Sequence, residues 1–116
     1  MAEKIVANVA EAGLLQTLTA ASAGGDSFLN DGKVFLVATN SHATLSRTIT
    51  FDVPNADNFG VSGSALDRAV VVAALTTKLI GPFRKVKFND NTGKVQMTYS
   101  SEADLTVEAV RLTPVS

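Results

Sequence analysis

Apolar and polar residues alternate along much of this chain. In the stretch 94–100 every second side chain is apolar or aromatic and the others are polar, and the stretches 45–53 and 105–109 repeat the pattern. Such alternation places one set of side chains on each face of a β-strand, so all three stretches are predicted to be half-buried strands. The apolar set of 45–53 begins at Leu45 and includes the position of Arg47, which we expect where that face meets solvent or a partner.

Two further stretches, residues 34–38 and 70–72, are apolar at every position. A strand without a polar face is covered on both sides, so both stretches are predicted to lie centrally in a sheet. Residues 73–76 are predicted to form a tight connection, after which a strand resumes at 78–80.

The stretch 86–88 is predicted to be a short strand with Lys85 and Lys87 pointing outward. Segments rich in Gly, Pro, Asn and Asp separate the strands, at residues 24–26, 30–32, 81–82 and 89–93. Seven or eight short strands with such turns predict an all-β fold, either an antiparallel β-sandwich or a small jelly-roll-like barrel. This single domain is predicted to span residues 13–116.

Two regions allow more than one structure. Residues 1–12 are predicted to be an N-terminal arm, but 3–13 fit either a short helix or an extended segment, because Ile5 and Val9 suit both periods. The connection 54–67 is long for a compact domain, and long ordered connections are often functional. Its apolar residues either fold back on the core or contact a partner.

The composition indicates one small domain that other molecules cover. The chain has 116 residues, no cysteine and a net charge of −1, which excludes a disulfide framework and argues against a general nucleic-acid binder. Charged residues make up 18% of the chain, below the usual ~25%. The start does not read as a signal peptide, and the longest apolar run is too short to span a bilayer. We therefore expect synthesis in the cytoplasm and binding to neither membranes nor nucleic acid.

Residues suited to catalysis or metal binding do not form a recognisable set. His42 is the only histidine and lies in a polar turn, so a Ser-His-acid arrangement is not favoured. One histidine without cysteine does not make a zinc site, and the loop beginning at Asn89 lacks the glutamate that closes a calcium loop. The chain is therefore predicted to be a non-enzymatic protein without metal or cofactor.

One charge feature stands out in the second half of the chain. Five basic residues fall close together, opposed there only by one aspartate: Lys78, Arg84, Lys85, Lys87 and Lys94. This strip fits docking on an acidic protein surface, or a solvated edge on which lysines deter strand pairing. The solvated edge is the favoured interpretation.

The strings GGDSFLNDGKVFLVATN and LSRTITFDV resemble the front half of small structural proteins of tailed phages and prophages. The string TTKLIGPFRKVKFNDNTGKVQMTYSSEADLTVEAVRL resembles their closing strands, so the likeness covers about residues 13–113. The proteins in question look like capsid decoration, or cement, subunits. The connection 54–67 is longer than expected for them.

The resemblance implies a sandwich-like module on the outside of the mature head, without catalytic residues. Such a subunit would bind the major capsid protein, often as a homotrimer, and its place would be the capsid exterior of the virion. We expect the N-terminal arm, the connection 54–67 and the basic strip to make the contacts. The predicted contact residues are Ile5, Val9, Phe59, Val61, Leu66, Arg84, Lys85 and Lys87.

Two alternatives remain open. A head–tail connector, or a tail tube or terminator subunit, would also be structural, and a clear helix would favour it. A carbohydrate-binding surface module generally needs exposed aromatics, and this chain has no tryptophan and one tyrosine.

Overall fold

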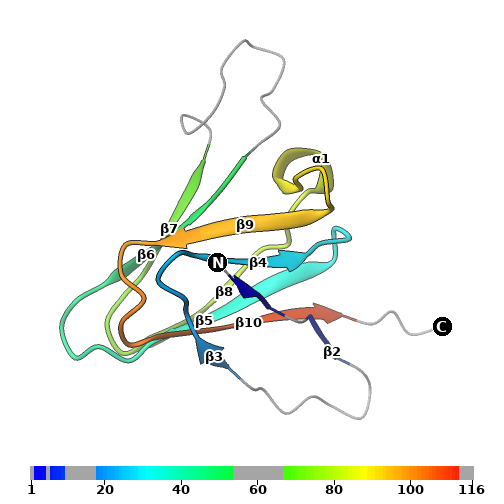
Figure 1. Cartoon of the computed structure of the whole chain (residues 1–116). Helices are drawn as coiled ribbons and strands as arrows, with labels where there is room; N and C mark the ends of the chain where they lie inside the picture. The colour runs from blue at the N-terminus through cyan, green and yellow to red at the C-terminus, as the bar shows by residue number, and fades with distance from the viewer. Residues whose placement is uncertain (1, 5, 10–17, 54–66, 113–116) are drawn as a thin grey trace.

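The computed structural model describes residues 2–4, 6–9, 18–53 and 67–112. These residues form two β-sheets packed face to face (Figure 1). The predicted all-β sandwich is therefore confirmed. Each sheet has five strands in the described part of the chain, because short strands near the N-terminus extend both sheets.

The first sheet has the strand order β1-β4-β9-β6-β7. Its strands are β1 (Ala2–Glu3), β4 (Asp26–Leu29), β9 (Lys94–Tyr99), β6 (Arg47–Phe51) and β7 (Arg68–Val72). All neighbours are antiparallel except β1, which runs parallel to β4.

The second sheet has the order β2-β10-β5-β8, and a further strand, β3, also pairs with β10. Its strands are β2 (Ala7–Val9), β3 (Thr19–Ala20), β5 (Val34–Asn40), β8 (Thr76–Ile80) and β10 (Leu105–Leu112). Only β2 runs parallel to its neighbour. The central position predicted for residues 34–38 is confirmed, since β5 lies between β10 and β8.

The core between the sheets contains an aromatic cluster centred on Phe83. Its ring lies 5.5 Å from that of Phe28, 4.8 Å from that of Phe51 and 5.4 Å from that of Phe88, measured between centroids. All four side chains are buried. Phe83 comes from the connection after β8, so a loop residue joins the two sheets at this end of the core.

The strand predicted at 86–88 is wrong, because this segment is the short helix α1 (Lys85–Phe88). The amide of Phe88 donates to the carbonyl of Arg84 at 3.0 Å. A strand would point Phe83 and Phe88 to opposite faces, because their separation is odd. The helical turn lets both rings reach one core, but residues 85–88 then make no hydrogen bonds to a neighbouring strand among those described.

The central position predicted for 70–72 is also wrong. β7 is the last strand of the first sheet, and only Val72 is fully buried, while Val71 is half exposed. Leu45 does not share the buried face of β6 either, because it lies before the strand and is exposed. Arg47 does lie on the apolar face, but it is buried and donates from Nε to the carbonyl of Ala103 at 3.0 Å.

The predicted N-terminal arm is extended where the structure describes it, and it belongs to this chain's own sheets. β1 pairs with β4 at the edge of the first sheet, and β2 pairs with β10 at the corresponding edge of the second. This side of the sandwich is therefore covered. The contacts that we expected the arm to make with a neighbouring subunit remain a prediction.

The other side of the sandwich is open in the described part of the chain. There β7 ends the first sheet and β8 ends the second, and each has one paired neighbour only. The predicted tight connection between them is confirmed, with Leu75 in the left-handed region at φ 60°. We call the surface of β7, this turn and β8 the open edge.

Candidate functional site

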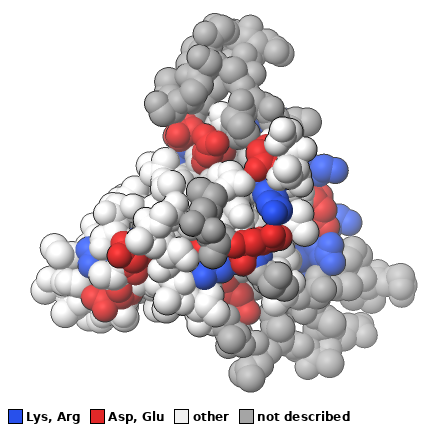
Figure 2. All heavy atoms as spheres, in the orientation of Figure 1, with Lys and Arg blue, Asp and Glu red and all other residues white. Residues whose placement is uncertain are grey.

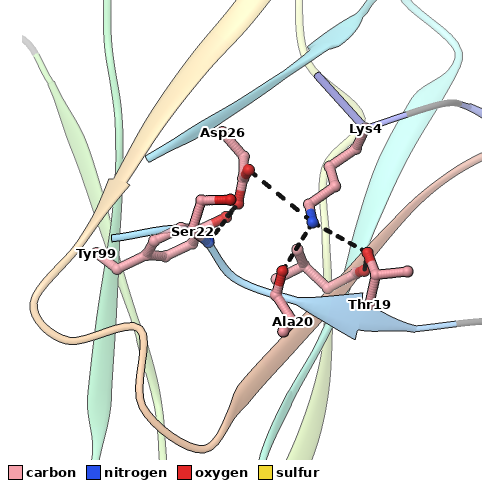
Figure 3. Close-up of polar contacts among 7 residues, drawn as sticks. Lys4, Thr19, Ala20, Ser22, Asp26 and Tyr99 are labelled. Atoms are coloured by element: carbon pink, nitrogen blue, oxygen red, sulfur yellow. Dashed lines mark hydrogen bonds and ion pairs between the residues drawn. The ribbon is translucent and has the colours of Figure 1, made fainter. Parts of the chain in front are cut away.

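Lys4 fastens the covered side of the sandwich (Figure 3). Its ammonium donates to the hydroxyl of Thr19 at 3.0 Å and to the carbonyl of Ala20 at 2.8 Å, and it lies 3.9 Å from the carboxylate of Asp26. Thr19 and Ala20 belong to the second sheet, and Asp26 begins β4 of the first. One side chain thus holds three separate segments together.

Asp26 is fully buried and is the acceptor at the centre of this cluster. Oδ2 accepts hydrogen bonds from the Tyr99 hydroxyl at 2.5 Å and from the Ser22 amide at 3.1 Å. Oδ1 has no hydrogen-bond partner among the described residues and faces only the Lys4 charge. A buried carboxylate is costly unless it is paired, so this cluster stabilises the fold only while it is complete.

Burial raises the pKa of Tyr99 well above its usual 10.0, and the hydrogen bond to the Asp26 carboxylate raises it further. The folded state therefore binds the phenolic proton more tightly than the unfolded chain does. The stability that this gives is complete below about pH 10 and is lost as the pH rises toward the folded pKa.

We therefore expect the folded protein to show no phenolate absorbance at the pH where free tyrosine ionises. Tyr99 is the only tyrosine, so an ultraviolet pH titration reports on it alone. Above that pH the free energy of unfolding should fall. It should fall less steeply in Tyr99→Phe, and this difference separates the effect of the phenol from that of the lysines, which titrate in the same range. A folded protein that forms phenolate at the usual pH would contradict the cluster.

Among the described residues, four of the five large apolar side chains that are exposed lie on or beside the open edge, and the fifth is Leu29 of β4. Val71, Leu75 and Leu79 are 52%, 69% and 65% exposed, and the equally exposed Leu45 lies nearby. The Asn40 side-chain amide shows this proximity, since it donates to the carbonyls of both Leu45 and Val72. Val71 points outward from the first sheet and Leu79 outward from the second, because their neighbours Val70 and Ile80 pair with the core residues Ile49 and Leu36. Exposed apolar side chains around an open sheet edge mark a candidate interaction surface.

A sheet edge is itself a docking site, because its outer amides and carbonyls have no strand partner. Lys78 is the charged residue of β8 that would deter pairing. Its ammonium instead donates to the carbonyl of Val71 on β7, at 3.1 Å. The lysine therefore links the two edge strands across the corner, which leaves the leucines beside it exposed.

A basic hollow lies at the end of the open edge where β7 begins. Its volume is about 250 Å³, and its lining includes the buried residues Ile80, Phe83 and Phe88. It is lined by Arg68, Val70, Ile80, Gly81, Pro82, Phe83, Arg84, Lys87 and Phe88. None of these residues is acidic, and neither arginine forms an ion pair with another described residue.

The predicted basic strip is thus divided by the fold. Arg84 and Lys87 share the hollow, whereas Lys85 packs its side chain near Gly32. Lys94 lies elsewhere and forms an ion pair with Glu3 at 2.9 Å.

Sequence reasoning missed Arg68, because it stands before an apolar run and far from the other cations along the chain. Leu75 and Leu79 were also missed as contact residues. For Leu75 the available signal was that an apolar residue in a short turn between strands has no core to enter. Leu79 lies within β8, and its exposure follows from its pairing with Val37 on the outer face of the sheet.

The other predicted contact residues are not placed by the structure. Ile5, Phe59, Val61 and Leu66 lie outside the described residues. Val9 is described only as part of the backbone of β2.

A second hollow on the first sheet is acidic and is lined in part by Asp52, Asp67 and Asp90. Burial raises the pKa of Asp52, and the neighbouring Asp67 carboxyl raises it further. Asp67 also accepts a hydrogen bond from the Val53 amide at 3.0 Å, so it ties the end of β6 to the start of β7. In the part of the chain described, no three acidic or histidine side chains are placed to hold a metal ion.

His42 has a local role in the turn before β6. Its Nδ1 accepts hydrogen bonds from the amides of Thr44 at 3.1 Å and Leu45 at 2.9 Å. The ring is half buried rather than fully exposed, because it folds over its own turn. This geometry uses the histidine as a backbone cap.

Comparison with known proteins finds no matching family model, no matching curated protein and no matching solved structure. Within the described ranges, no helix has the length and apolar character of a membrane span. Charged side chains form small separate groups between broad uncharged areas on the face shown in Figure 2. The function must therefore be argued from the surface, and the open edge with its basic hollow is the candidate site.

Proposed function

We propose that this chain is a structural virion protein, a capsid decoration subunit that binds the outer surface of the major capsid protein. Its open edge would lie against the shell or against neighbouring copies. A homotrimer is the favoured assembly, because decoration subunits of the kind that the sequence resembles often sit at three-fold positions.

The observation that carries the proposal is that the edge strands of both sheets, β7 and β8, lie on the same side of the sandwich and have exposed leucines on and beside them. Leu75 and Leu79 are 69% and 65% exposed, and apolar surface left in water is unfavourable. Burying them on a partner removes that cost and satisfies the strand edges. A subunit repeated around a shell needs no more than such modest contacts, because symmetry multiplies them.

The alternative of a ring-forming connector or tail subunit gains no specific support. The feature that would favour it is a clear helix on a sheet, and α1, the helix of the described residues, has four residues. The carbohydrate-binding alternative would use exposed aromatics, yet the aromatic residues around the basic hollow, Phe83 and Phe88, are buried.

The deciding experiment is the copy number of this chain in purified particles from the genome that encodes it, measured by quantitative mass spectrometry against the major capsid protein. We expect copies in the hundreds per particle. Six or twelve copies would support a connector or tail ring instead, and absence from the particle would refute a virion role.

A further inference from the structure

We infer that the basic hollow binds a carboxylate of a partner protein, presented by a segment in which an acidic residue neighbours apolar ones. The cations come from two places in the fold, since Arg68 begins β7 and Arg84 and Lys87 lie at α1. This chemistry follows from the hollow itself, whereas identifying the partner as a shell protein rests on the proposed function.

No acidic residue that the structure describes lines the hollow to balance its positive charge. Arg68 and Arg84 are exposed, and no ion pair within the described residues involves them. Lys87 lies 5.7 Å from the ring centroid of Phe88, which orients the ammonium without neutralising it. Because the whole chain carries a net charge of −1, this positive potential is a local feature of one corner.

The cations of the hollow make a carboxylate the fitting anion. They adjoin the buried rings of Phe83 and Phe88, and opposite charges attract more strongly beside protein than in bulk water. An arginine guanidinium also matches the two oxygens of a carboxylate in a bidentate contact. The volume of about 250 Å³ accommodates one or two side chains, not a nucleic-acid strand.

The neighbouring surface specifies what surrounds the carboxylate. Ile80 lines the hollow, and Leu79, the residue before it in β8, is 65% exposed on the outer face of the second sheet. An extended segment that places its acidic residue on Arg68 and Arg84 and runs along β8 would lay an apolar side chain beside Leu79. It could also pair with the free edge of β8, so one segment satisfies charge, apolar surface and backbone together.

The test uses nuclear magnetic resonance titration of the full chain with the capped peptide Glu-Leu-Glu-Leu. The capped peptide Gln-Leu-Gln-Leu is the uncharged control. We expect the glutamate peptide to shift the amide signals of the hollow, and Arg84→Glu or Arg68→Glu to weaken its binding by about tenfold or more. Lys33→Glu makes the same change of charge at an exposed site outside the hollow and should leave binding unchanged.

Several outcomes would overturn the inference. These are equal binding of the two peptides, equal effects of Arg84→Glu and Lys33→Glu, or stronger binding of a single-stranded oligonucleotide than of the glutamate peptide. Circular dichroism of each variant checks the fold, and Arg84→Gln offers a milder change that should weaken binding in the same direction.

Particle occupancy separates this inference from the proposed function. Arg84→Glu present at the normal copy number would refute the hollow as the docking site while leaving the virion role intact. Absence of the unmodified chain from particles would refute the virion role, and the peptide titration would still decide the chemistry of the hollow.

Discussion

Phe83→Ala is expected to lower the free energy of unfolding by about 3–5 kcal/mol. Phe83 is buried and its ring touches three others, so its removal leaves a cavity at the point where Phe28, Phe51 and Phe88 converge. Small domains have about 5–15 kcal/mol of stability in total, so the variant should be close to unfolding at room temperature. Denaturant titration followed by circular dichroism measures the change.

The matched control is Phe35→Ala. Phe35 has the same side chain but is only half buried on β5, so its loss should cost clearly less. Equal losses at the two positions would mean that the aromatic cluster is not the centre of the core. Because Phe83 also lines the basic hollow, peptide binding should weaken together with stability in Phe83→Ala.

Asp26→Ala is expected to cost a comparable 3–5 kcal/mol, roughly the loss that follows when one partner of a buried ion pair is removed. The change leaves the Tyr99 hydroxyl without its acceptor and the Lys4 ammonium without its counter-charge. Because Lys4 links both sheets, we also expect faster hydrogen exchange in the amides of β2. Denaturant titration and hydrogen exchange test the two parts of this prediction.

The control for Asp26 is Glu3→Ala, which removes a different ion pair of the same N-terminal segment. Glu3 and Lys94 are 2.9 Å apart but partly exposed, and exposed pairs contribute about 0–1 kcal/mol. A loss at Glu3 as large as that at Asp26 would show that the covered edge depends on strand pairing in general. It would contradict the central role assigned to the buried carboxylate.

The sheet edges are covered on one side of the sandwich and open on the other. On the covered side, the N-terminal segment occupies the edges of both sheets, and Lys4 locks it with charge and hydrogen bonds. On the open side, Asn40 and Lys78 tie β7 to the second sheet through its carbonyls but leave the outer apolar side chains exposed. This difference is the reason that we propose the open edge as the binding surface.

Alternation in the sequence was sufficient to predict the strands β6, β9 and β10 and the sandwich class. The period of two follows directly from strand geometry, so it survives without knowledge of the neighbours. The predicted central place of β5 was correct for the same kind of reason, because a strand with no polar face must be covered on both sides. The predicted turn before β8 was correct as well.

Position within the sheets was decided by tertiary structure. The apolar run of β7 reads like that of β5, yet β7 lies at an edge, because composition does not state how many neighbours a strand has. Residues 85–88 alternate like a strand but form a helical turn, since only that turn brings Phe83 and Phe88 into one core. The basic hollow likewise depends on folding, which places Arg68 beside Arg84 and separates both from Lys94.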